Sequence, residues 1–168
     1  MEHQKDFAEF CASMNRHGVD YLIVGGYAVA FHGAPRFTGD IDMFVRPAAE
    51  NYARLLQALH DFGFPVEGLD PSYLAAHRKI LQLGVPPVQI HLMSSISAVD
   101  FEKAWDKRVR GVYGGNPVDY IDLQTLLRNK RASGRPKDLA DVTALLSVRR
   151  RRKKNLTPRK GPSPAPAS

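Results

Sequence analysis

The chain has 168 residues, of which 43% are hydrophobic, and a formal net charge of +7. This composition excludes a disordered protein, and the length favours one compact domain with a hydrophobic core. Residues 149–168 contain eight Lys or Arg and no acidic residue, which leaves 16 basic and 17 acidic side chains in residues 1–148. The excess positive charge therefore belongs to the C-terminal segment and does not mark the whole surface as one that binds nucleic acid.

Cysteine usage and hydropathy indicate the compartment. Cys11 is the only cysteine, which excludes an intramolecular disulfide and suits a reducing environment. No uninterrupted apolar run approaches the length of about 18 residues that a membrane-spanning helix needs, and no apolar segment follows a basic start. We therefore expect a cytoplasmic protein without a membrane partner.

Predicted helices and strands alternate along residues 1–148. Helices are predicted where apolar residues recur every three or four positions, and strands where short apolar runs lie between turn residues. In chain order we expect a helix over 5–17, a strand over 21–24, a helix over 27–33, a strand over 40–45, helices over 48–62 and 71–78, a hairpin of strands 80–83 and 88–93, a helix over 99–106, an edge strand over 108–113, and helices over 122–133 and 136–148. This order predicts an α+β fold with a mixed sheet of about five strands, flanked by helices and followed by a helical C-terminal part.

The last twenty residues differ in composition from the rest. We divide the chain into one domain, residues 1–148, and a basic tail rich in Pro and Ser, residues 149–168. A run of six basic residues cannot bury apolar surface, so the tail is predicted to be disordered beyond the helix that precedes it. Two roles remain open for it: a solvated terminus that raises solubility, and a salt-sensitive contact with RNA phosphates.

Two glycines and two aspartates form the most informative pattern. A predicted strand leads into Gly25-Gly26, and after thirteen intervening residues Asp40-Ile41-Asp42 begins a second strand. Side chains alternate along a strand, so Asp40 and Asp42 point to one side while Ile41 faces the core. Two carboxylates this close repel each other unless a cation lies between them, and hard oxygen ligands suit Mg²⁺ or Mn²⁺. We therefore expect both aspartates to bind the metal ion of a nucleoside triphosphate.

The two glycines have a separate predicted role. Without a Cβ at Gly25 or Gly26, a phosphate can approach the backbone amides at the start of the helix that follows. Anions prefer such helix N-termini. The alternative is a tight turn followed by a solvated strand end, because Gly-Gly pairs and acid-apolar-acid triplets are each common.

At this point the residues resemble a known family. Gly-Gly, a spacer and Asp-x-Asp between apolar residues are similar to the signature of the polymerase-beta-like nucleotidyltransferase superfamily. The sequences VGGYAV at 24–29 and RFTGDID at 36–42 resemble those of small bacterial nucleotidyltransferases of the AbiEii type, many of which are toxins of type IV toxin–antitoxin pairs. The resemblance extends to residues 96–105 and 129–141 and covers most of residues 5–148. It implies a nucleotidyltransferase fold and a nucleoside triphosphate, such as ATP, as substrate.

A lysine on the helix predicted over 122–133 belongs to a second group of candidates. Apolar residues at Leu123, Leu126 and Leu127 place Lys130 on the same side of this helix. Such a lysine either points inward or extends its ammonium to the surface along an apolar stem. The resemblance implies that Lys130 lies near the incoming phosphates and neutralises charge as pyrophosphate leaves.

The next helix supplies two further candidates for nucleotide binding. Gly134 ends one predicted helix and Pro136 opens the next, which places Lys137 and Asp138 in its first turn. An acid in this position caps free amides and complements the helix dipole, by about 0.3–1 kcal/mol. Asp138 can also support a nucleotide site, and the two roles are compatible.

Three more residues complete the candidate site. Arg36 and Thr38 come just before Asp40, where they either contact phosphate or are ordinary loop residues. Sequences of the resembled family have a third acid on the strand that here includes His91, and that acid helps to bind metal and deprotonates the acceptor hydroxyl. Histidine is a poor Mg²⁺ ligand, yet a neutral imidazole with a pKa of about 6.5 can act as a general base. His91 can equally face solvent or form a hydrogen bond within the sheet.

The leading functional hypothesis is a metal-dependent nucleotidyltransferase that transfers a nucleoside monophosphate to an acceptor hydroxyl. The acceptor would be tRNA or another RNA, a protein or a small molecule such as an antibiotic, and an antitoxin protein would be a partner if the chain is a toxin. The alternative is a nucleotide- or RNA-binding protein of the same fold in which His91 has impaired catalysis.

Overall fold

The computed structural model describes residues 5–77 and 80–156, whose strands form one six-stranded mixed sheet in the order β3-β4-β2-β1-β6-β5. The β2–β4 and β1–β6 pairs are parallel and the other neighbouring pairs are antiparallel. The strands are β1 (Tyr21–Val24), β2 (Asp40–Val45), β3 (Ile80–Val85), β4 (Val88–Met93), β5 (Val109–Tyr113) and β6 (Asn116–Tyr120). The predicted α+β class, the mixed sheet and the β3–β4 hairpin are confirmed.

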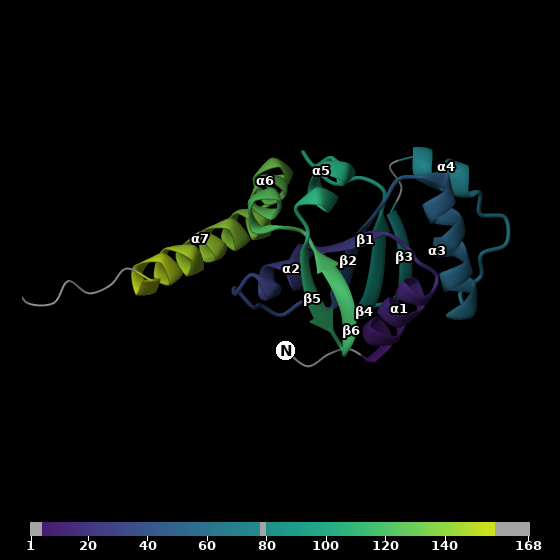
Figure 1. Ribbon diagram of the computed structural model, residues 1–168, viewed down its shortest axis with the longest axis horizontal. Coiled ribbons are helices and arrows are strands. Elements are labelled where there is room, and N and C mark those ends of the chain that lie inside the picture. Colours follow the sequence, from purple (N-terminus) through teal and green to yellow (C-terminus); the bar gives the residue numbers. More distant parts are fainter. Residues whose placement is uncertain (1–4, 78–79, 157–168) are drawn as a thin grey trace, which may run out of the picture.

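Helices surround this sheet (Figure 1). They are α1 (Lys5–Arg16), α2 (Gly25–Phe31), α3 (Ala49–Asp61), α4 (Pro71–Ala76), α5 (Phe101–Asp106), α6 (Leu123–Ser133) and α7 (Pro136–Leu156). In Figure 1, α1, α3 and α4 lie to one side of the sheet, whereas α6 and α7 lie at the opposite side and α7 projects away from the body. Among the described helices, none combines the length and apolar character needed to cross a bilayer.

The core forms where the amphipathic helices α1 and α3 pack together and against the sheet. Phe7 and Phe10, three residues apart on α1, and Leu55 on α3 are fully buried on the apolar faces of their helices. The thiol of Cys11 is buried in the same cluster, and burial raises its pKa to about 11. This packing holds β1 and β2 at the centre of the sheet, and the candidate site lies at the end of these two strands.

The sheet has one strand more than predicted. Strand β6 was missed because Asn116, Pro117 and Asp119 interrupt its apolar pattern. It forms a hairpin with β5, joined by Gly114 and Gly115, and both glycines have positive φ, as a two-residue hairpin turn requires. The predicted strand over 108–113 is β5, and its position at the edge of the sheet is confirmed.

The last helix is longer than predicted. Helix α7 does not end at Val148 but continues to Leu156, so residues 149–156 of the predicted tail are helical. Residues 157–168, for which disorder was predicted, lie outside the described residues. The helix continues because Arg and Lys are good helix formers and no Gly or Pro occurs before Pro158.

Candidate active site

The two aspartates and the two glycines of the main motif lie together. Val24 pairs with Asp42 across the antiparallel β1–β2 ladder, so the chain leaving β1 passes beside the start of β2. On β2, Asp40 and Asp42 are half-buried on one face while Ile41 is fully buried on the other, as strand alternation predicts. Together with Gly25 and Gly26 the two aspartates line a cavity of about 860 Å³.

Most of the other candidates line the same cavity. Of the predicted site residues, only Asp138 does not line this cavity. The residues that do are Gly25, Gly26, Arg36, Thr38, Asp40, Asp42, His91, Lys130 and Lys137. The cavity therefore combines two carboxylates with four basic side chains, since Arg135 also lines it. Such a combination suits an anionic ligand that carries a cation.

The absence of a side chain at Gly25 makes room for another side chain of the protein, and not only for a phosphate. Helix α2 begins at Gly25 itself, two residues before its predicted start, and Gly25 has a φ of +63°. A Cβ at Gly25 would overlap Oδ2 of Asp42. The missing side chain thus leaves room for the carboxylate of Asp42, and the backbone adopts a conformation that favours glycine. At Gly26 a Cβ would lie 3.1 Å from the side chain of Thr38, so this turn is also closely packed.

Gly25→Ala is expected to displace the carboxylate of Asp42 and to lower both nucleotide affinity and activity. Gly18→Ala is a matched control, because Gly18 has a φ of +66° and a Cβ there would meet only one atom, 3.9 Å away. Each variant should lose about 1–2 kcal/mol of stability from the left-handed backbone. Titration with a triphosphate and Mg²⁺ should show weaker binding for Gly25→Ala alone, and equal binding by both variants would contradict the close fit between Gly25 and Asp42.

His91 lies directly beside Asp42. The two residues are register partners in the parallel β2–β4 pair, and Nδ1 of His91 donates a hydrogen bond to Oδ1 of Asp42 over 2.9 Å. Of the two predicted environments, solvent or a hydrogen bond within the sheet, the structure thus has the hydrogen bond. Nε2 of His91 is buried and has no hydrogen-bond partner in the described part of the chain. The imidazole therefore orients one of the two carboxylates.

Lys130 points inward and is held by two acids. Its side chain is 4% exposed, and Nζ lies 2.8 Å from Oδ1 of Asp138 and 2.9 Å from Oδ2 of Asp141. Of the two directions that the sequence left open for this lysine, the structure has the inward one. The structure does not bring Asp138 to the cavity wall, because this residue is fully buried behind Lys130. Any support that Asp138 gives to a nucleotide is consequently indirect.

Asp141, which the sequence analysis did not select, connects this helix pair to the loop before β2. Its two carboxylate oxygens accept hydrogen bonds from Nε and Nη2 of Arg36, at 2.7 and 3.0 Å. Arg36 is thus neither an ordinary loop residue nor a free phosphate ligand, because its guanidinium forms a bidentate ion pair. The pair joins residues that are 105 positions apart, so no local sequence signal predicts it.

The ionic cluster is completed by residues at the junction of α6 and α7. Nε of Arg135 and Oγ of Ser133 donate to Oδ2 of Asp138, at 2.6 and 2.9 Å. Burial alone would raise the pKa of Asp138, but the hydrogen bonds from Arg135, Lys130 and Ser133 outweigh it and hold that pKa well below its usual range. Burial would also raise the pKa of Asp141, but the hydrogen bonds from Arg36 and Lys130 outweigh this effect, so the pKa of Asp141 is lowered as well. Both carboxylates are therefore charged at neutral pH.

The two carboxylates of the cavity would suit a metal ion that arrives with a substrate. In the part of the chain that the structure describes, no three His, Cys, Asp or Glu side chains are grouped closely enough to hold a metal. Mg²⁺ commonly binds through one or two carboxylates, substrate phosphates and water, and it does not need a cage made wholly of protein ligands. Asp40 and Asp42 match this requirement, because both line the cavity and both are partly accessible.

Comparison with protein-family models and with curated protein sequences gave no match. Comparison with solved structures did give matches. The lincosamide antibiotic adenylyltransferase LnuA, bound to lincomycin, has a TM-score of 0.57 at 16% identity, over 86% of this chain and 97% of its own. A Thermotoga maritima protein described as a nucleotidyltransferase has a TM-score of 0.52 at 15% identity, over 88% and 91% of the two chains. The antibiotic-resistance factor ANT(2'')-Ia has a TM-score of 0.52 at 14% identity, over 90% and 92%.

These similarities establish the class of fold. The mixed sheet, the flanking helices and the helical C-terminal part match structures of nucleotidyltransferases over most of both chains. This chain therefore has the nucleotidyltransferase fold. Membership of the AbiEii-type family stays a prediction from the sequence, because none of the three proteins is described by that name.

Proposed function

We propose that this protein is a metal-dependent nucleotidyltransferase that transfers a nucleoside monophosphate from a nucleoside triphosphate to an acceptor hydroxyl. The observation that carries the proposal is the position of Asp40 and Asp42 on one face of β2, at the wall of a cavity beside Gly25 and Gly26. The cavity volume of about 860 Å³ lies within the range of about 300–1,000 Å³ that is usual for small-molecule sites.

The reaction defines what the side chains have to do. The acceptor oxygen forms a bond to the α-phosphorus, the bond to the pyrophosphate oxygen breaks, and the hydroxyl proton leaves to a base or to water. A bound Mg²⁺ or Mn²⁺ would supply charge neutralisation on the triphosphate. Asp40 and Asp42 would orient that substrate, and the hydrogen bond from His91 would fix the rotamer of Asp42.

The basic side chains of the cavity would neutralise the phosphates. Lys137 is exposed on the wall, and Lys130 reaches the same wall from between its two carboxylates. The cluster of Arg36, Lys130 and Arg135 with Asp138 and Asp141 keeps one net positive charge. We assign to this cluster the role of holding a positive charge at a fixed place while pyrophosphate leaves.

Two classes of acceptor are compatible with the proposed reaction. LnuA is described as an antibiotic adenylyltransferase and ANT(2'')-Ia as an antibiotic-resistance factor, which favours a small hydroxylated molecule as one acceptor class. The resemblance to AbiEii-type toxins favours RNA or protein instead, with growth arrest as the consequence and an antitoxin as a partner. Cells that express the wild-type chain are compared with cells that express Asp42→Asn, with and without antibiotics. A toxin should slow the growth of wild-type cells without antibiotic, whereas a resistance enzyme should let them grow in its presence.

A labelling experiment tests the activity directly. Purified full-length protein, incubated with each α-³²P-labelled nucleoside triphosphate, Mg²⁺ and a cell extract divided into RNA, protein and small molecules, is expected to label one fraction. Addition of EDTA should abolish the labelling, because the triphosphate then lacks its cation. Label that appears equally in the presence of EDTA would contradict a metal-dependent transfer.

One observation favours a second candidate function, a nucleotide- or RNA-binding protein without catalysis. His91 occupies the place where the resembled family has a third acid, and its Nε2, the ring nitrogen left to accept a proton when Nδ1 donates to Asp42, is buried. The second candidate predicts that calorimetry detects binding of a triphosphate with Mg²⁺ while no fraction is labelled. It also predicts that His91→Asp creates activity, whereas the first candidate predicts activity in the wild-type chain.

A further inference from the structure

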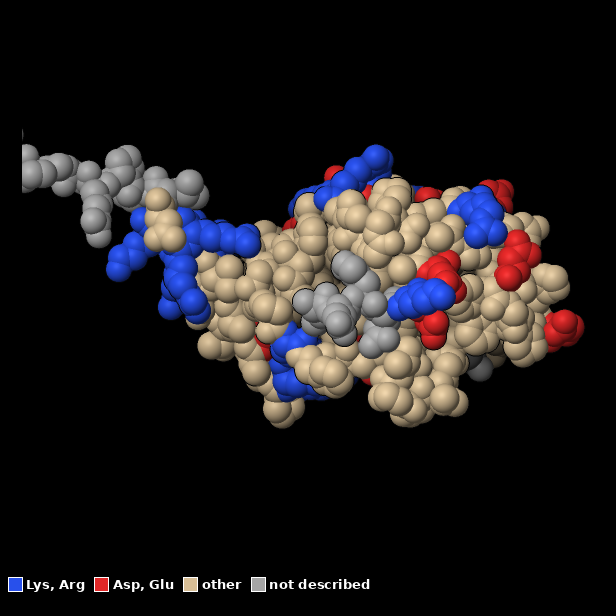
Figure 2. All heavy atoms as spheres, turned by 90° about the horizontal axis from the view of Figure 1, so that it is seen from below, with Lys and Arg blue, Asp and Glu red and all other residues tan. Residues whose placement is uncertain are grey.

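The C-terminal half of α7 carries a dense positive charge in a folded segment. Six consecutive basic residues, Arg149–Lys154, lie within the helix, and residues 150–155 are exposed. We call this segment the basic arm. The acidic residues of α7 do not neutralise it, because Asp138 and Asp141 are buried and pair with Lys130. Figure 2 shows the blue side chains gathered where α7 protrudes from the body.

The basic arm lies at a defined distance from the cavity. Lys137, in the first turn of the same helix, lines the cavity wall. With a rise of about 1.5 Å per residue, the basic arm begins about 18 Å from Lys137 along the helix axis and ends about 26 Å from it. Val148 and Arg152 lie against Gly33, where a Cβ would be 3.1 Å from the first and 2.9 Å from the second, so the arm contacts the body.

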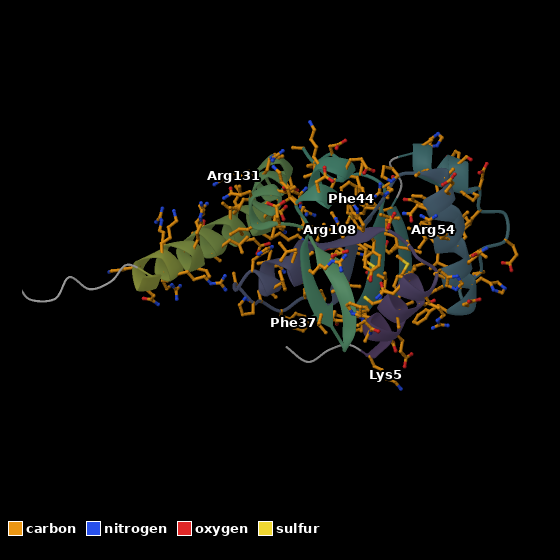
Figure 3. All side chains as sticks on the ribbon, in the orientation of Figure 1. Lys5, Phe37, Phe44, Arg54, Arg108 and Arg131 are labelled. Atoms are coloured by element: carbon orange, nitrogen blue, oxygen red, sulfur yellow. The ribbon has the colours of Figure 1, made fainter. Side chains whose placement is uncertain are left out.

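Further positive charge lies close to the cavity. Arg128 and Arg131 are exposed on α6, and Arg131 is adjacent in sequence to Ala132 and Ser133, which line the cavity (Figure 3). Lys137 adds a third exposed basic side chain at the start of α7. Positive charge is thus present both at the cavity and at the far end of α7, whereas residues 1–148 as a whole are about neutral.

The chemistry of the basic arm indicates the kind of partner. Consecutive residues of a helix are separated by about 100°, so six of them surround the helix axis completely. No apolar side chain occurs among residues 149–154, so a protein partner would find no apolar patch of the kind that forms the centre of most interfaces. A flexible chain of regularly spaced phosphates matches this distribution, because counterion release needs charge and no shaped surface.

We propose that the basic arm binds the phosphate backbone of an RNA strand whose end reaches the cavity. RNA fits better than DNA, because RNA offers a hydroxyl on every nucleotide and the proposed reaction needs an acceptor hydroxyl. At about 3.4 Å per stacked nucleotide, a strand that contacts both the cavity and the arm is about five to eight nucleotides long. The acceptor role and the choice of RNA over DNA rest on the proposed function, whereas binding of a phosphate backbone by the arm does not.

The test compares two full-length variants with the same loss of charge, each in the inactive Asp42→Asn background. In the arm variant, Arg149, Arg150, Arg151 and Arg152 are replaced by Gln, which has a similar helix propensity. In the control variant, four exposed basic residues away from the cavity wall are replaced by Gln, namely Lys5, Arg16, Lys107 and Arg110. Fluorescence anisotropy then measures the affinity for labelled single-stranded RNA and DNA of about 12 nucleotides as a function of salt concentration.

The arm variant is expected to bind RNA at least about tenfold more weakly at low salt and to lower the slope of log K against log salt by about 3, since four phosphate contacts are lost. The control variant should keep the slope of the parent. Equal losses in both variants would overturn the proposal, and so would stronger binding of DNA than of RNA by the parent. A protein captured from extract through the arm in place of RNA would also overturn it.

Transfer assays in the active chain separate this proposal from the proposed function. If transfer occurs, the arm substitutions should slow labelling of an RNA of about 12 nucleotides at least about tenfold and leave one of about 4 nucleotides unchanged, because only the longer strand reaches the arm. Equal slowing of both lengths would overturn the geometry. If no labelling occurs in any chain but the arm variant has lost RNA binding, the result contradicts the proposed nucleotide transfer and confirms RNA binding by the basic arm.

Discussion

Asp42→Asn is expected to lower nucleotide transfer by at least about 10²-fold, because it removes a negative charge that would hold the metal ion of the triphosphate and keeps the shape of the side chain. The fold should be retained. The asparagine oxygen can still accept the hydrogen bond from Nδ1 of His91, and the missing Cβ of Gly25 leaves the same space. Initial rates with a labelled triphosphate and the acceptor fraction identified in extract give the measurement, and thermal melting verifies the fold.

Two companion variants make the result specific to the cavity. Asp40→Asn removes the second carboxylate on the same face of β2 and should also reduce transfer strongly. Asp6→Asn changes an exposed acid in the first turn of α1 and should leave transfer unchanged. Transfer that survives Asp42→Asn would remove the main support for the proposed activity, since Asp40 and Asp42 are the only acids among the described residues that line this cavity.

Local patterns predicted the elements that position the site. The alternation at Asp40 and Asp42 predicted their common face, and the helical spacing before Lys130 placed this lysine on the apolar side of its helix. The partners of that lysine were not predictable in the same way. Asp138 was expected to cap its own helix or support the nucleotide, and the structure has it bound to side chains of Lys130, Ser133 and Arg135. Pairing between helices depends on how they pack, which spacing within one helix does not encode.

The errors in the fold have similar causes. Strand β6 lacks a clear alternation, but Gly114-Gly115 between two short runs is a recognised hairpin signal that would have identified it. The predicted end of helix α7, Val148, is where its apolar residues end, although no helix-breaking residue follows directly. Periodicity finds the apolar face of a helix and cannot locate an end that extends into solvent.

Lys130→Met is expected to destabilise the protein by about 3 kcal/mol, because it leaves two buried carboxylates with fewer positive partners. The loss should stay near the lower end of the range of about 3–5 kcal/mol for a broken buried pair, since Arg135 still binds Asp138 and Arg36 still binds Asp141. Urea denaturation at pH 7 provides the measurement. Lys137→Met is the matched control, because this lysine is exposed on the same cavity wall and its loss should change stability by less than about 0.5 kcal/mol.

The pH dependence of the same variants tests the cause. Asp138 and Asp141 have lowered pKa values in the folded chain, so their ion pairs contribute stability above the unfolded pKa of about 3.9 and lose it as the pH falls through the folded values. Without Lys130 this contribution is smaller. The difference in unfolding free energy between Lys130→Met and the wild type should therefore be largest near neutral pH and narrow below about pH 4. A difference that is constant over this range would show that lost packing, and not the lost charge, causes the destabilisation.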